Sequence, residues 1–426
     1  MAGLEFNGIS VTPEQLAAFK AWLSANGGLP AGDFAPGGSA AAQVAGLDQR
    51  SSPLAVSALP AWRGAVAAVL LGQRDGIIQS VGDSTSRGVI GITGQGASYI
   101  GGQANSYPAL LARALKASGI PAEMKSWFGS GGFLPTHTMN QYEPRVTHSG
   151  GWAFATAVNI MLGKPMENTT DTAAMTFTET EIDTCDIYYE QNVGNGVFSW
   201  AVDGGAATNV DTNGTQQIQK ITVPLGSAGT HATAIRRVSG TVRIYGMECY
   251  NSTKRVIRIR SIGEGSTRAS QWISTSAYAP GRELGGGTGN SGRFTADLHL
   301  INLGINDWVD PTEPSEATYQ ANMVSIGQAA KRTSAADVVY IKPFPTNVSS
   351  ISSDRQVKMN RAIDAAAALN GAPVISWPDR VKDFATALNG GFCTGSDGLH
   401  PTPAGYLDFT GYLRWVLDSE LPRLSA

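Results

Sequence analysis

Cysteine and charge are both scarce in this sequence. Its three cysteines, Cys185, Cys249 and Cys393, are too few and too widely spaced for a disulfide framework, and no C-x-x-C pair exists to bind zinc or exchange thiols. Charged residues make up 15% of the chain and the net charge is −3, so no broad positive field is available for nucleic acid or anionic lipid. The composition therefore argues against nucleic-acid and membrane-surface partners.

A leader peptide and a membrane-spanning segment are also missing from the pattern. Residues 1–6 lack the basic stretch, followed by an apolar one, that marks a secretory signal. The longest apolar stretch, residues 64–72, is about half as long as a bilayer span requires. We therefore expect a soluble protein, and the pattern leaves its compartment open.

Glycine, by contrast, is abundant, with 51 residues in a chain of 426, where ordinary proteins contain about 7%. Together with the low charge, this favours turn-rich β structure and uncharged polar surfaces. Bulk disorder is excluded, because 42% of the residues are apolar.

From residue 76 onwards, short apolar runs alternate with helical patterns. The strand-like runs are 77–81, 298–303, 338–341 and 374–377, and the helical patterns cover 108–119, 315–332, 355–369 and 403–420. Strands separated by helices of this length form right-handed βαβ crossovers, which produce a parallel sheet covered by helices on both faces. The sequence therefore predicts a doubly wound α/β fold.

This alternation is interrupted between residues 135 and 255. Five short strand-like runs replace the helices, at 186–190, 197–202, 218–225, 232–238 and 241–247. Such a series indicates an antiparallel β-sandwich inserted into the α/β domain. We divide the chain into an N-terminal helix and linker or attachment arm (1–75), two parts of one α/β domain (76–134 and 256–426), and the insert (135–255). Within the arm, a helix is expected over about 12–23 and a linker over about 29–60.

Three polar motifs lie next to predicted strands. Gly82-Asp83-Ser84 follows the first strand, Gly304-Ile305-Asn306-Asp307 follows the second, and Asp397-Gly398-Leu399-His400 lies between the last strand and the closing helix. Each motif alone is ordinary turn chemistry. Because ligands bind at the carboxyl ends of the strands in an open α/β sheet, we expect all three motifs to share one crevice.

Together the motifs contain the groups that acyl transfer requires. Ser84 is the candidate nucleophile, His400 the candidate base, and Asp397 is near enough in sequence to accept the imidazole Nδ1 proton and orient the ring. Asn306 offers an amide donor for an oxyanion. This chemistry needs no cofactor. No G-x-S-x-G motif occurs, so the common α/β-hydrolase arrangement is disfavoured.

With these three motifs the sequence resembles the SGNH (GDSL) hydrolase family, over about residues 76–134 and 256–420. The resemblance implies a flavodoxin-like three-layer fold and an esterase or lipase reaction. It places Ser84, Asn306, Asp397 and His400 in the family's catalytic positions. It also implies an oxyanion hole formed by the Ser84 backbone amide, the Asn306 side chain and the backbone amide of a glycine.

Two glycines compete for that third oxyanion position. Gly265 follows the strand-like run 256–260, and a Ser-Thr pair follows it, as it often does in the corresponding block of the family. Gly132 follows the first crossover helix. We favour Gly265 and keep Gly132 as the alternative.

Several other residues have plainer structural interpretations. The remaining histidines, His137, His148, His231 and His299, show no metal-ligand spacing, so no metal site is expected, and His299 is expected in the core. The G-x-G-x-x-G stretch 287–292 lacks the strand and helix of a dinucleotide site and is interpreted as a loop. Trp308 either lines the substrate pocket or is a buried structural residue. Arg87 either contacts an anionic substrate group or, as we expect, lies on a solvated surface.

The resemblance also suggests a substrate class. Family members with an accessory β-sandwich frequently act on acylated carbohydrates, which implies O-deacetylation of a polysaccharide or glycan. A short-chain carboxylesterase or lipase, and a non-catalytic glycan-binding protein, are the alternatives. The Ala- and Gly-rich N-terminal arm loosely resembles the anchoring parts of phage tail or prophage proteins, which implies a virion-associated or extracellular homo-oligomer.

Overall fold

The chain divides into two units, residues 1–55 and 56–426. The computed structural model describes residues 4–6, 9–11, 59–94, 96–129, 139–155, 164–273, 284, 294–309, 314–332, 335–347 and 353–419. In the first unit, β1 (Leu4–Phe6) and β2 (Ile9–Val11) form an antiparallel hairpin. The helix expected over 12–23 and nearly all of the expected linker lie outside the described residues.

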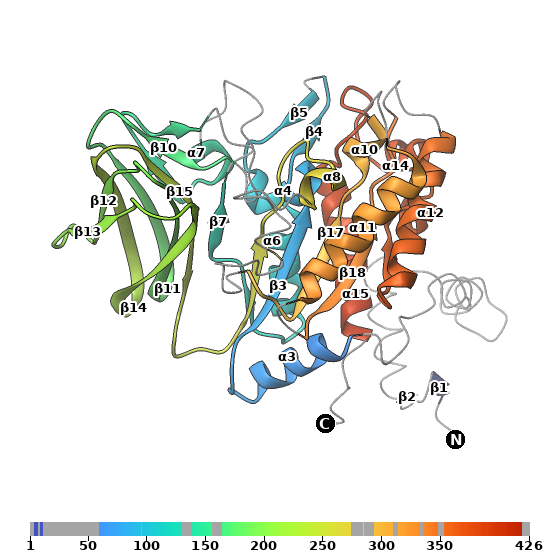
Figure 1. Cartoon of the computed structure of the whole chain (residues 1–426). Coiled ribbons are helices and arrows are strands. Elements are labelled where there is room, and N and C mark those ends of the chain that lie inside the picture. The colour runs from blue at the N-terminus through green and yellow to red at the C-terminus, as the bar shows by residue number, and fades with distance from the viewer. Residues whose placement is uncertain are drawn as a thin grey trace. The chain divides into compact units, whose positions relative to one another are not determined.

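A parallel sheet forms the centre of the second unit (Figure 1). Its strands are β3 (Gly76–Gly82), β6 (Ala122–Glu123), β16 (Ile257–Ser261), β17 (Leu298–Asn302), β18 (Asp337–Lys342) and β19 (Val374–Ser376), in the order β19-β18-β17-β3-β16-β6. All neighbouring pairs are parallel, which confirms the predicted sheet. Because β16 and β17 pair with opposite edges of β3, the crossover direction reverses there. Such a switch point opens a crevice at the carboxyl ends of the strands.

Helices cover both faces of this sheet, as side chains that alternate along β3 indicate. Val81 packs in one cluster with Met323 of α11 (Glu316–Lys331) and with residues of α12 (Ser353–Leu369). The adjacent Ser80 points the other way, where its hydroxyl lies 2.7 Å from that of Tyr107 in α6 (Tyr107–Ala117). On that face, Phe409 of α15 (Pro403–Ser419) stands edge-on to the Tyr107 ring, with the centroids 5.7 Å apart. The predicted three-layer arrangement is therefore confirmed.

Residues 60–70, for which the sequence predicts no helix, form α3 (Pro60–Leu70). Proline in the first turn suits a helix start, and the buried Trp62, Val66 and Val69 recur at helical spacing. Trp62 is fixed by a bond from its indole N–H to the carbonyl of Leu417. The longest apolar stretch of the sequence thus belongs mostly to a helix packed on the α/β unit. No helix in the described part of the chain is long and apolar enough to cross a membrane.

The inserted region is antiparallel, as predicted, but its layers belong to one continuous, curled sheet. The long strands are β11 (Ala174–Gln191), β14 (Gln217–Ser239) and β15 (Val242–Tyr250). The shorter β12 (Val197–Val202) and β13 (Thr208–Asp211) lie beyond β14, and β7 (Ser126–Phe128), β8 (Val146–His148), β9 (Ala153–Phe154) and β10 (Met166–Asn168) complete the sheet. The predicted strands 218–225 and 232–238 are one strand, because β14 pairs with β11 along nearly its whole length. The ladder shifts register near Glu181, whose φ is +52°, and there the sheet bends.

Candidate active site

Ser84 lies on a tight turn at the end of β3, where the short helix α4 (Ser84–Arg87) begins. Asp83 caps this helix, because its Oδ1 accepts hydrogen bonds from the Thr85 amide at 2.9 Å and the Thr85 hydroxyl at 2.8 Å. Gly82 permits the turn, since a Cβ there would lie 2.0 Å from Ser86 Oγ and 2.6 Å from the Asn302 carbonyl oxygen. The local sequence therefore presents Ser84 at the carboxyl end of the central strand.

His400 and Asp397 reach the same place from the loop before α15. The Ser84 hydroxyl and His400 Nε2 are 2.9 Å apart. On the other side of the ring, His400 Nδ1 lies 3.1 Å from Asp397 Oδ2 and 3.2 Å from Oδ1. The His400 backbone amide also donates to the Asp397 carboxylate. The structure thus brings the three predicted residues into one hydrogen-bonded chain, with Ser84 and His400 each only 6% exposed.

The electrostatics of Asp397 favour its ionised form. Burial raises the pKa of its carboxyl, but hydrogen bonds from the side chain and backbone of His400, together with the charge of that ring, outweigh burial and bring the pKa below its usual value. A carboxylate accepting the Nδ1 proton leaves Nε2 as the acceptor facing Ser84. The arrangement can therefore remove a proton from the Ser84 hydroxyl.

The two predicted oxyanion contributors outside the Ser84 turn lie in the segments that follow β17 and β16. Asn306 stands in α10 (Ile305–Val309), directly after β17, and donates one amide hydrogen to the Thr267 carbonyl at 3.0 Å. Gly265 lies in the loop between β16 and α8 (Ala269–Trp272), where the Glu264 amide donates to the Gly82 carbonyl at 2.9 Å. This loop therefore runs beside the end of β3. The competing Gly132 lies outside the described residues.

Asp307, next to Asn306, is a fully buried acid. Burial raises the pKa of its carboxyl to about 7, although the Ala269 amide donates to it, and the nearby Asp83 raises it further. In the unfolded chain the pKa is near 4. The unfolded state therefore releases its proton at lower pH than the folded state, and stability falls as pH rises from about 4 to about 7.

Asp307→Asn is expected to abolish the fall in folding stability between about pH 4 and about pH 7, because an amide does not ionise. The amide oxygen still accepts from the Ala269 amide, so the variant and the wild type should melt alike near pH 4. Above pH 7 the variant should be more stable by up to roughly 4 kcal/mol, because the pKa differs by about 3 between the folded and the unfolded chain, at about 1.4 kcal/mol each. Thermal melts across this pH range test the idea, with Asp354→Asn, an exposed acid on α12, as control. If the melting temperatures of the variant and the wild type changed with pH in the same way, the pKa of Asp307 would be the same in the folded and unfolded chain, which would contradict the prediction.

The expectation that Arg87 lies on a solvated surface is wrong. The Arg87 side chain is fully buried. It donates through Nε to the Gly263 carbonyl and through Nη1 to the Phe128 carbonyl, and Nη2 lies 3.8 Å from Glu264 Oε2. Burial raises the pKa of the Glu264 carboxyl to about 8, against the opposing charge of Arg87. No periodicity marked Arg87 in the sequence, because its partners are backbone carbonyls of distant segments.

The remaining sequence candidates are distributed as follows. His299 is buried in β17 beside Gln79, 3.4 Å from it, and burial lowers the pKa of the imidazole to about 4, as expected for a core residue. Trp308 is also fully buried, so it is structural. His231 pairs with Asp203, and the loop 287–292 and His137 lie outside the described residues. Within the described ranges, no three His, Cys, Asp or Glu side chains gather as metal ligands would.

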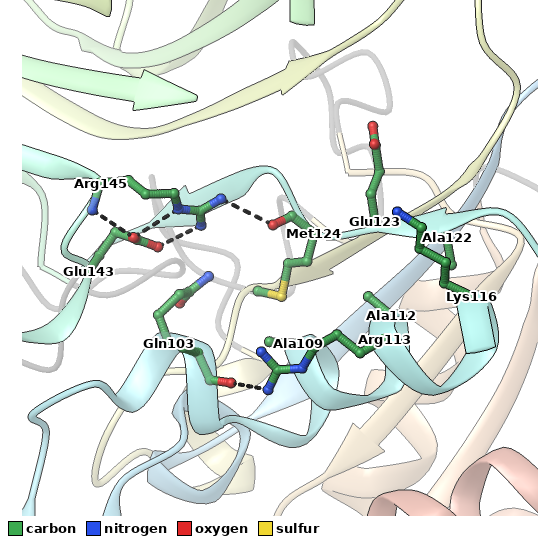
Figure 2. Close-up of a pocket in the computed structure, with 11 residues that line it drawn as sticks. Gln103, Ala109, Ala112, Arg113, Lys116, Ala122, Glu123, Met124, Glu143 and Arg145 are labelled. Atoms are coloured by element: carbon green, nitrogen blue, oxygen red, sulfur yellow. Dashed lines mark hydrogen bonds and ion pairs between the residues drawn. The ribbon is translucent and has the colours of Figure 1, made fainter. Parts of the chain in front are cut away.

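A separate hollow of about 280 Å³ lies between α6, the β6 region and the segment before β8 (Figure 2). Polar and charged side chains line much of it, and Arg145 is tied to Glu143 by two hydrogen bonds. Its lining residues do not include Ser84, Asp397 or His400. This hollow is therefore distinct from the hydrogen-bonded chain at Ser84.

Comparison with known proteins agrees with this fold. The family described as "GDSL-like Lipase/Acylhydrolase family" matches residues 255–407, which include Asn306, Asp397 and His400 but not Ser84, because the insert separates the first motif from the rest. A solved structure titled "Peptidoglycan O-acetylesterase in action, 5 min" is similar at 16% identity and a TM-score of 0.62, over 84% of this chain and 95% of that one.

Other solved structures resemble this chain less closely. A family two carbohydrate esterase from Cellvibrio japonicus shares 12% identity over 65% of this chain and 96% of its own, at a TM-score of 0.29. A lipase/acylhydrolase from Enterococcus faecalis shares 15% identity over 40% of this chain and 80% of its own, at a TM-score of 0.31. No curated protein sequence matches the chain. The family match shows a GDSL-like lipase/acylhydrolase domain at residues 255–407, and the shared fold is that of an SGNH hydrolase.

Proposed function

We propose that this protein is a serine esterase that hydrolyses acyl esters, chiefly O-acetyl esters, on a carbohydrate. The observation that supports this most directly is the chain from Ser84 Oγ to His400 Nε2 at 2.9 Å and from His400 Nδ1 to Asp397 at 3.1 Å. These are the contacts of a nucleophile, a general base and a group that orients the base. Their position at the switch point of the sheet is where substrates bind in such folds.

The reaction has two halves. In the first, His400 takes the Ser84 proton while Oγ attacks the ester carbonyl carbon, and the protonated imidazole then gives that proton to the departing sugar oxygen, which leaves as a hydroxyl. In the second, His400 takes a proton from water, which attacks the acyl-Ser84 carbonyl. The imidazolium then returns that proton to Ser84 Oγ as the carboxylic acid leaves. Asp397 holds the ring and supports its positive charge in both halves. The amides of Ser84 and Gly265 and the side chain of Asn306 stabilise the negative oxygen of each tetrahedral intermediate.

The choice of a carbohydrate ester is supported by likeness. The similar solved structure is named a peptidoglycan O-acetylesterase, at 16% identity, so the glycan and the acyl group of this protein are proposed by analogy. The insert and the N-terminal arm fit the same proposal, in which the arm attaches the enzyme to a particle or a partner copy. A short-chain carboxylesterase or lipase is the alternative activity.

The deciding experiment measures acetate released from a panel of O-acetylated polysaccharides, including O-acetylated peptidoglycan and acetylated xylan. A p-nitrophenyl acetate and p-nitrophenyl octanoate pair is assayed beside the panel. Acetate release from at least one glycan supports the proposal. Turnover of the octanoate ester with no release from any glycan would favour the lipase alternative. Glycan binding without any ester turnover would leave a binding protein.

Asn306→Ala is expected to lower kcat by about 10²- to 10³-fold with little change in KM, because the amide donates to an oxygen that becomes negative only in the transition state. Steady-state kinetics on p-nitrophenyl acetate measure this. Asn389→Ala, on the exposed end of α14 (Phe384–Asn389), is the matched control. A rise in KM at constant kcat would instead place Asn306 in ground-state binding.

A further inference from the structure

Three segments distant in sequence meet at the side chain of Arg87. The first is its own helix α4, which begins with Ser84. The second is the loop after β16, whose Gly263 carbonyl accepts from Arg87 Nε and whose Glu264 carboxylate lies 3.8 Å from Nη2. The third is β7 (Ser126–Phe128), whose Phe128 carbonyl accepts from Nη1. A single guanidinium therefore contacts the nucleophile segment, the proposed oxyanion loop and β7.

A buried guanidinium needs hydrogen-bond acceptors in fixed positions. Burying a charge is costly unless it is paired and hydrogen-bonded, and the planar fork of arginine sends its donors in fixed directions. At Arg87 two backbone carbonyls accept in those directions, and the Glu264 carboxyl lies 3.8 Å from Nη2, beyond hydrogen-bond distance. The two carbonyls cannot shift independently without leaving a buried donor unpaired. The arginine thus sets their relative positions.

The oxyanion loop is also held against the Ser84 turn. The Glu264 amide donates to the Gly82 carbonyl at 2.9 Å, and the Thr267 hydroxyl donates to the Glu264 carbonyl at 2.7 Å. A Cβ at Gly263 would stand 2.9 Å from Ser86 Cβ and 3.0 Å from the Asp83 carbonyl oxygen. With so little clearance, a shift of this loop would move the Gly265 amide relative to Ser84.

Strand β7 belongs to the sheet of the insert. It pairs antiparallel with β15, with Phe128 opposite Gly246, where a Cβ would lie 2.2 Å from the Trp127 carbonyl oxygen. The Phe128 ring meets Tyr188 of β11 edge-on, with centroids 5.2 Å apart. Nearby, Arg260 of β16 forms a buried ion pair with Glu248 of β15 at 2.6 Å. The insert therefore shares its core with the α/β unit, and Figure 1 shows β7 between the two.

We propose that Arg87 is a positioning residue for the esterase, which fixes the Gly265 loop relative to Ser84 and joins that loop to the insert through Phe128. This inference rests on the proposed function. On this view the insert is part of the catalytic unit, because one of the carbonyls that orients Arg87 belongs to its sheet. Arg87 itself touches no substrate. Its effect reaches the reaction through the geometry of the oxyanion donors.

The test compares Arg87→Lys and Arg87→Met with the wild type on p-nitrophenyl acetate. Lysine keeps the charge but cannot hold two divergent carbonyls at fixed angles, and methionine keeps only part of the buried volume. Misplacement of catalytic donors by about an ångström lowers rates by up to about 10²-fold. We expect kcat per titrated active site to fall about 10-fold for lysine and about 100-fold for methionine, with KM within about threefold of the wild type. Arg113→Lys, an exposed arginine beside the hollow in Figure 2, is the control.

Active-site titration by the acyl burst separates positioning from folding. If Arg87 only stabilised the fold, fewer sites would titrate but each would turn over at the wild-type rate, and that result would overturn the proposal. Should Arg87→Met fail to fold, Arg87→Lys decides alone: a kcat per site within twofold of the wild type rejects positioning, and a tenfold loss supports it. Failure of the proposed function looks different, because the wild type itself would then be inactive, or as active as Ser84→Ala.

Discussion

Ser84→Ala is expected to abolish ester hydrolysis, lowering kcat by about 10⁵- to 10⁶-fold, to the level that the oxyanion donors and binding supply without a nucleophile. The reason is that no other group in the proposed mechanism can form the covalent acyl intermediate. The measurement is acetate or p-nitrophenol release at matched enzyme concentrations. The matched control is Ser118→Ala at the exposed end of α6, whose hydroxyl bonds only a local helix carbonyl, Ala114, at 2.8 Å.

The same variant also separates catalysis from stability. Ser84 contributes one hydrogen bond, to His400, so its removal should change the free energy of unfolding by about 1 kcal/mol or less. Mass spectrometry of the wild type stopped during turnover should find an acyl group on the peptide that contains Ser84. Equal ester turnover by Ser84→Ala and the wild type would remove the nucleophile assignment and the mechanism built on it.

Asp397→Asn is expected to give the second largest loss, about 10³- to 10⁴-fold in kcat. An asparagine amide donates to Nδ1 where the carboxylate accepts from it, so the imidazole would carry its proton on Nε2 and could not accept from Ser84. The variant also loses the negative charge that supports the imidazolium. KM should change little, because Asp397 contacts the substrate only through His400.

The control for Asp397→Asn is Asp354→Asn, an exposed acid that pairs with Lys358 one turn along α12 at 2.6 Å. A surface pair of this kind contributes little, so the control should keep wild-type kinetics. A loss of less than about tenfold for Asp397→Asn would mean that the backbone, and not the carboxylate, sets the tautomer of His400. The role proposed for the Asp397 carboxylate in the mechanism would then be wrong.

The convergence of Ser84, Asn306 and the Asp397–His400 loop was predictable because of where the motifs occur. The first two motifs follow short apolar runs that alternate with helical patterns, which indicates buried parallel strands, and the carboxyl ends of such strands meet at one edge. The structure places Ser84 within 2.9 Å of His400, although 316 residues separate them in the chain.

Other features were not predictable, because they depend on contacts between distant backbones. The prediction that Arg87 lies on the surface was wrong, because its two acceptors are backbone carbonyls, and the side-chain pattern of the sequence does not mark them. Residues 218–225 and 232–238 looked like two strands, whereas both pair with β11 in one ladder, on either side of a register shift opposite Ile182. The helix α3 has a single charged residue, Arg63, so its amphipathic pattern was weak.

The sequence by itself determined the α/β alternation, the antiparallel insert and the order of the polar motifs, because hydrophobic period and turn chemistry are local properties of the chain. Only the tertiary structure decided what surrounds the nucleophile: the buried arginine behind it, the loop tied to Gly82, and the entry of β7 into the sheet of the insert. Those contacts join backbone atoms far apart in the chain. A backbone carbonyl has the same chemistry at every residue, so no sequence motif indicates which carbonyl will accept a hydrogen bond from a buried guanidinium.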